Sequence, residues 1–163
     1  SDVYKRQHTW FECKIRYEKV MENGMQKKVT EPYLVDALSF TEAEARIIEE
    51  MTPFISGEFT VSDIKRANYS ELFPSDEESA DRWFKCKLIF ITLDEKSGAE
   101  KKTSTQVLVQ AADLRDAVKK LDEGMKGTMA DYQIGMVSET PLMDVYPYSA
   151  EPNDKPEFDP SKA

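Results

Sequence analysis

The alternation of apolar and polar residues in TWFECKIRYEK, residues 9–19, predicts a β-strand with one buried face. Every second side chain is apolar, and these side chains would point the same way: Phe11, Cys13, Ile15 and Tyr17. Asn23-Gly24 follows, a pair typical of the type I′ hairpin turn, in which both central residues need positive φ. The chain should therefore return through VTEPYLVDA as a second strand, with Pro32 at an edge or a bulge.

A helix should follow over SFTEAEARIIEEM, residues 39–51. Ser39 with Glu42 three residues later is the capping-box pattern, in which each side chain binds an amide that the first helical turn leaves unpaired. The apolar residues of this segment recur at helical spacing: Phe40, Ala43, Ile47 and Met51. EFTVSDI then has the alternation of a third strand, so the unit reads β-β-α-β.

The same order of elements is predicted again, 73 or 74 residues further along the chain. TWFECKI reappears as RWFKCKL, so that Trp83 takes the place of Trp10, and Asp113 takes the place of Ser39. A hairpin around DEKSGAEKK, a helix over ADLRDAVKKLDEGM and a strand around DYQIGMV complete the second unit. Because the offset holds along the whole unit, we infer an internal duplication. The predicted domain covers residues 8–148 and has three parts: repeats 9–74 and 82–147, and an acidic linker at 75–81.

Two β-β-α-β units predict an α+β protein. The expected arrangement is an antiparallel-rich sheet with both helices on one face, related by a pseudo-twofold axis. Two smaller sheets packed together are the alternative that the repeat leaves open. In either case the core should consist of alternating strand residues and the apolar helix stripes: Phe11, Cys13, Ile15, Tyr17, Phe84, Cys86, Leu88 and Phe90 with Ala43, Ile47, Ala117 and Leu121.

Both ends of the chain differ from the rest. The first seven residues, SDVYKRQ, resemble the translated end of a sequencing-library adapter, and we expect them to be a non-native scar. Residues 149–163 contain three prolines and almost nothing apolar, which is typical of a disordered tail. No run approaches the roughly 18 apolar residues of a membrane helix, and no signal-peptide core is visible. We therefore expect a cytoplasmic protein that has no membrane partner.

The charge and the residue types of the chain limit the partners and the kinds of site that we expect. The chain carries 22 Lys and Arg against 31 Asp and Glu, a formal net charge of −9, which disfavours nucleic acid as a partner because phosphate binding depends on cations. Two cysteines, Cys13 and Cys86, are too few for a disulfide framework, and their place on the core side predicts simple packing. His8 is the single histidine, and no metal-ligand spacing or phosphate-binding glycine motif is present. We expect no enzyme, no metal and no cofactor.

Two tryptophans and two lysines stand out on the strand faces opposite the core. Lys14 follows Trp10 four residues later on one face, and Lys87 follows Trp83 in the same way. A ring beside an ammonium group can stack a planar ligand and neutralise an anion, so these four residues are our candidate ligand-binding or interface surface. In the alternative, each tryptophan seals the second face of its sheet or lies in an oligomer interface, with lysine stems covering the rest.

The segment HTWFECKIRYEKVMENGMQKKVTEPYLVDALSFTEAEA resembles the opening of an uncharacterised family of gut-bacterial and phage proteins, domain of unknown function four-four-nine-four. The resemblance extends from His8 to about Tyr148. It implies a small cytoplasmic protein of phages, prophages or mobile elements, with no assigned activity and no functional residues to carry over.

The function that we expect is non-catalytic binding by a homo-oligomer. Its ligand would be a small anionic, nucleotide-like molecule or a partner protein, held on the surface of Trp10, Lys14, Trp83 and Lys87. The alternative is a single-stranded nucleic-acid-binding accessory factor that stacks bases on the same rings, although the net charge counts against it. An enzyme that acts through carboxylates is the third hypothesis.

Overall fold

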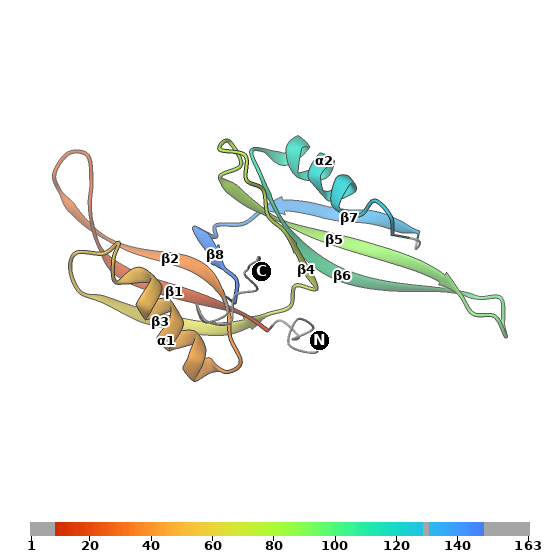
Figure 1. The fold of residues 1–163 in the computed structure, drawn as a ribbon, viewed down its shortest axis with the longest axis horizontal. Helices are drawn as coiled ribbons and strands as arrows, with labels where there is room; N and C mark the ends of the chain where they lie inside the picture. Colours follow the sequence, from red (N-terminus) through yellow and green to blue (C-terminus); the bar gives the residue numbers. More distant parts are fainter. Residues whose placement is uncertain (1–8, 129–130, 149–163) are drawn as a thin grey trace, which may run out of the picture. The chain divides into compact units, whose positions relative to one another are not determined.

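A computed structural model describes residues 9–128 and 131–148 of the chain. Within them, eight strands and two helices form two compact units with one helix each, and the ribbon in Figure 1 traces these elements. The predicted scar at residues 1–7 and the predicted tail at residues 149–163 lie outside the described residues. Neither described helix is both long and apolar enough to cross a membrane.

The first unit comprises the described residues up to 66 and those from 145 onward. Its strands are arranged in the order β3-β1-β2-β8. The elements are β1 (Trp10–Val20), β2 (Gln26–Asp36), α1 (Phe40–Met51), β3 (Phe59–Ala67) and β8 (Asp144–Tyr146). β1 and β2 form an antiparallel hairpin, and α1 packs on it through its apolar stripe.

The second unit comprises residues 67–144, and its sheet has the order β4-β6-β5-β7. The elements are β4 (Glu71–Phe73), β5 (Arg82–Leu93), β6 (Glu100–Ala111), α2 (Leu114–Gly124) and β7 (Tyr132–Glu139). β5 is antiparallel to both β6 and β7, whereas β4 runs parallel to β6. The sheet is therefore mixed.

The predicted α+β class is confirmed, but the single sheet with two helices on one face is wrong. The described strands form two four-stranded sheets, each with one helix. Each helix finds enough apolar strand surface in its own unit to close a separate core. The units also differ from the predicted repeats at their ends, because β4 pairs in the second sheet and β8 in the first. The duplication itself remains a hypothesis about ancestry.

The predicted core is largely confirmed. Ten of the twelve predicted side chains are buried: Phe11, Cys13, Ile15, Phe84, Cys86, Leu88, Ala43, Ile47, Ala117 and Leu121. Tyr17 and Phe90 are only half-buried, and Phe90 borders the pocket described below. Of the predicted stripe of α1, Phe40 is 47% exposed, although its ring makes an edge contact with Phe11 at 4.9 Å between centroids.

Both helices begin at the predicted caps. The Ser39 hydroxyl accepts a hydrogen bond from the Glu42 amide at 3.1 Å, and the Glu42 carboxylate accepts one from the Leu38 amide at 2.6 Å. In α2, Asp113 and Asp116 take the same two roles. In the predicted capping box, the Glu42 carboxylate would accept a hydrogen bond from the amide of the cap residue itself. In both helices the carboxylate instead accepts from the amide of the residue before the cap, which the helix also leaves unpaired.

The first hairpin turn differs from the prediction. Gly24 has a φ of +82°, but no non-glycine residue among those described has positive φ, so Asn23 cannot belong to a type I′ turn. The Gly24 amide donates to the Met21 carbonyl and the Met21 amide donates to the Met25 carbonyl, at 2.9 and 2.8 Å. This is a three-residue loop with glycine in the left-handed position, the next most common hairpin geometry.

The acidic linker at residues 75–81 is held against α2. The Lys120 ammonium group contacts the Glu77 carboxylate at 2.6 Å, the Ser75 hydroxyl at 3.1 Å and the Asp116 carboxylate at 2.9 Å. Ala80 is 4% exposed. The linker thus folds as part of the second unit, and its negative charge is partly compensated by a lysine that the helix supplies.

Candidate functional site: a pocket in the second unit

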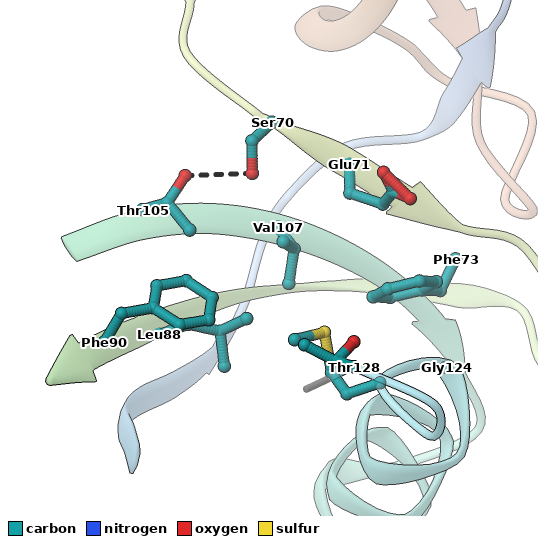
Figure 2. A pocket seen from close by; sticks show the side chains of 10 residues that line it. Ser70, Glu71, Phe73, Leu88, Phe90, Thr105, Val107, Gly124 and Thr128 are labelled. Carbon is teal, nitrogen blue, oxygen red and sulfur yellow. Dashed lines mark hydrogen bonds between the residues drawn. The ribbon is translucent and has the colours of Figure 1, made fainter. Parts of the chain in front are cut away.

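A pocket with a volume of about 380 Å³ opens in the second unit beside the C-terminal end of α2 (Figure 2). This volume lies in the range of about 300–1,000 Å³ that is typical of small-molecule sites. Three strands and the end of the helix contribute its walls. Its apolar lining consists of Phe73 from β4, Leu88 and Phe90 from β5, Val107 from β6, and Met125 after α2.

Strand alternation explains why apolar side chains gather here. Leu88 and Phe90 are two residues apart on β5 and share the face that α2 covers. Val107 lies opposite Cys86 in the β5–β6 register, so it points to the same face. Leu88 and Val107 are almost fully buried, at 1% and 2% exposed, whereas Phe90 remains half-buried. The covered part of the sheet thus passes directly into an open apolar pocket.

Gly124 shapes the wall on the helix side. A Cβ atom at this position would lie 2.8 Å from both Cδ1 and Cε1 of Phe73, closer than real Cβ contacts allow. The missing side chain therefore lets the Phe73 ring lie against the last turn of α2. Any larger residue would push this ring from its place at the border of the pocket.

The rim of the pocket is polar. The Thr105 hydroxyl donates to the Ser70 hydroxyl oxygen at 2.9 Å, as the dashed line in Figure 2 shows. The Ser70 hydroxyl in turn donates to the Gln106 carbonyl at 3.2 Å. Glu71 and Thr128 complete the rim, and no Lys or Arg of the described chain is among the lining residues. The site therefore combines an apolar interior with hydrogen-bond acceptors at its mouth.

The first unit fills the corresponding place with larger side chains. Tyr33 pairs with Cys13 as Val107 pairs with Cys86, and the Tyr33 ring stacks on Tyr146 of β8, with centroids 6.2 Å apart. The order of strands puts β8 beside β2 as it puts β4 beside β6. A tyrosine in one unit is thus replaced by a valine in the other, which removes a ring from the space beside the helix.

A carboxylate ties these tyrosines together. The Tyr17 and Tyr33 hydroxyls donate to the Glu31 carboxylate at 2.8 and 3.4 Å, and Lys19 lies 3.6 Å from it. Burial, followed by the hydrogen bond to Glu31, raises the pKa of Tyr17 to about 12, and burial also raises the pKa of Tyr33. Thr105 takes the place of Glu31 in the second unit, since it faces Leu88 as Glu31 faces Ile15. The first unit therefore has a hydrogen-bonded cluster at the positions where the second unit has Val107 and Thr105.

The predicted surface of tryptophans and lysines is placed differently from the expectation. Trp10 and Trp83 are 4% and 5% exposed, so neither indole offers an open stacking face. Lys14 is half-buried and Lys87 is exposed. Each tryptophan lies with its lysine on its own strand, in its own unit. The alternative, in which each indole seals the second face of its sheet, agrees better with this burial.

Sequence reasoning missed the pocket, although one signal for it was available. Aligning YLVDA with VLVQA sets Val107 against Tyr33, a marked loss of side-chain volume at a core position. The rim residues Ser70 and Glu71 could not be found in this way. They reach the site only because β4 pairs with β6, more than 30 residues further along the chain.

The two cysteines of the described chain are not activated as nucleophiles. Burial raises the pKa of the Cys13 thiol to about 12 and that of the Cys86 thiol to about 11, so both are neutral near pH 7. The residues that the structure describes contain no group of three or more His, Cys, Asp or Glu that could hold a metal ion. His8 lies outside the described residues.

Comparison with known proteins gives one match. No curated protein and no solved structure matches the chain. The model of one family matches residues 9–148, which include every described strand and helix. The chain therefore belongs to the family described as Domain of unknown function (DUF4494).

Proposed function

We propose that this chain is a non-catalytic binding protein, and that its second unit takes up a small, partly apolar molecule in the pocket beside α2. The contrast between the two units carries the proposal. Corresponding strands pair in the same order and register, β3-β1-β2-β8 in one unit and β7-β5-β6-β4 in the other. On the face that the helix covers, one unit has a stacked pair of tyrosines and the other has the pocket. An apolar cavity open to water has a cost in stability, which a ligand would offset.

The pocket supports binding better than the tryptophan surface does. A nucleotide-like ligand stacked on Trp10 or Trp83 needs an exposed ring, and both rings are buried. The same burial disfavours single-strand binding through these residues. In the pocket, the rings of Phe73 and Phe90 are half-buried and border open space, so they can contact a ligand without rearrangement of the sheet.

The biological setting that we propose follows from the family resemblance alone. It is a small cytoplasmic protein of phages or mobile elements. We propose separately, and not from the resemblance, that it acts as a homo-oligomer that sequesters its ligand. Two buried, unpaired thiols are compatible with a reducing compartment. Sedimentation of the purified chain tests the oligomer directly, and a monomer would remove that part of the proposal.

Titration of the protein with a neutral aromatic alcohol, tryptophol, tests the pocket. We expect shifts of backbone amide signals in a nitrogen-15 correlation spectrum that are confined to the segments lining the pocket, residues 70–73, 88–90, 105–107 and 124–128. Val107→Tyr should abolish these shifts because it restores the ring that Tyr33 supplies in the first unit. Gly124→Ala should weaken them, since the added methyl group would collide with the Phe73 ring and displace this part of the pocket wall.

The matched control is Ser104→Tyr, which adds the same ring to the same strand on the opposite face, at an exposed position. It should leave binding unchanged. Equal loss of binding in Ser104→Tyr and Val107→Tyr, with both variants folded, would contradict a site at the pocket. The absence of pocket shifts with any apolar probe would refute the proposed function as a whole.

A further inference from the structure

We infer that the ligand of this pocket carries a positively charged donor group, such as a protonated amine, on an apolar body of about the size of an aromatic ring system. The inference rests on the proposed function and adds the chemical class of the ligand. It depends on the direction of the hydrogen bonds at the rim and on the sign of the single charge there.

The hydroxyl hydrogens at the rim are already engaged. Thr105 donates to the Ser70 hydroxyl oxygen, and Ser70 donates to the Gln106 carbonyl. A hydroxyl has one hydrogen and two lone pairs, so what these two groups retain for a ligand is acceptor capacity. This part of the rim is therefore suited to a ligand that donates hydrogen bonds.

Glu71 adds a negative charge to the same place. It lies two residues before Phe73 on β4, so both side chains project from the same face of the strand, and both line the pocket (Figure 2). Among the described residues, Glu71 has neither an ion-pair partner nor a side-chain hydrogen bond. A carboxylate can only accept hydrogen bonds, and an ammonium group can only donate them. An anionic ligand would meet this charge without a lysine or arginine to compensate for it.

The apolar lining is compatible with a cation at the mouth. Phe73 and Phe90 contribute aromatic rings to the pocket, and the negative face of such a ring attracts a nearby ammonium group. Leu88 and Val107 form the deeper surface, which accepts only an uncharged ring or chain. An amine joined by a short arm to an aromatic body would meet both requirements.

Three compounds with the same indole ring and a two-carbon arm test this inference: tryptamine, tryptophol and indole-3-propionate. We expect the cation to bind about two- to fivefold more tightly than the alcohol, since Glu71 is solvent-exposed and exposed ion pairs are weak. The anion should bind more weakly than the alcohol. The preference for tryptamine should shrink between about 0.05 M and about 1 M salt, because ions screen exposed charges.

Glu71→Gln keeps the shape of the side chain and removes its charge, so tryptamine and tryptophol should then bind equally. Glu78→Gln, which neutralises an exposed carboxylate that does not line the pocket, is the control and should leave the preference intact. If all three compounds bind the wild type equally at the pocket, the inferred ligand class is wrong and the proposed function survives. If none binds there, both are wrong.

Discussion

Replacement of Leu121 by alanine should destabilise the protein strongly, because this side chain is the centre of the contact between α2 and its sheet. Leu121 is 0% exposed and belongs to the core cluster that contains Cys86, Leu88 and Val109. Truncation of a buried leucine costs about 2–5 kcal/mol, the sum of lost transfer free energy and the cavity that remains. For a chain of this length, each kcal/mol lowers Tm by about 2–4 °C.

The same helix offers a matched control. Leu114→Ala makes the same chemical change in the first turn of α2, where the side chain is 52% exposed. Its cost should stay within about 0.5 kcal/mol, as is usual for surface positions. Urea unfolding followed by tryptophan fluorescence measures both variants, because buried indoles become exposed to water on unfolding. A cost below about 1 kcal/mol for Leu121→Ala, or equal costs at both positions, would show that the buried face of α2 is assigned wrongly.

Two further predictions concern ionisable groups. Cys13 and Cys86 should react with a thiol reagent at pH 8 only after addition of denaturant, since burial holds their pKa values at about 12 and about 11; rapid labelling of the native protein would show that the sheets open readily. The hydrogen bond from the Ala112 amide, together with the nearby Lys120, holds the pKa of Asp116 below its usual value. The ionised Asp116 carboxylate therefore stabilises the fold above about pH 4, and this stabilisation is lost as the pH falls through the lowered pKa. Urea midpoints of Asp116→Asn and the wild type should therefore differ at neutral pH and converge in acid, and a constant difference would contradict this linkage.

Local signals in the sequence predicted the elements and most of the core. Ser39 and Asp113 are caps because their side chains reach an amide three residues away, an interaction that depends on adjacent residues alone. Alternation in the first strand of each unit identified Phe11 and Phe84 as buried, because alternation too depends only on neighbouring residues. The predicted type of turn at Asn23 was wrong because an Asn-Gly pair is compatible with more than one loop length. The periodicity of the flanking strands does not distinguish between these lengths.

The arrangement of the sheets and the pocket could not be predicted, because both depend on pairing between distant segments. β4 and β8 have only three residues each, too few for a periodic pattern, yet they decide which strands form each sheet. Strand alternation assigns the tryptophans to the face opposite the helix residues, but it does not reveal that they are buried. Ser70 and Glu71 have no motif of their own and become part of a site only through β4.

The exchange of the two short strands has a consequence for synthesis of the chain on the ribosome. β2 is among the first segments to emerge, but its neighbour β8 is the last of the described elements. The Tyr148 amide, which donates to the Asp36 carboxylate at 3.3 Å, is 112 residues further along the chain than Asp36. In a nascent chain, the edge of β2 that will pair with β8 must therefore stay unpaired while the second unit is translated. An edge left open in this way can pair with other chains, and contacts of such long range slow folding. Rapid docking of the second unit's own strands would shorten that interval, so the order of synthesis favours a second unit that folds without delay.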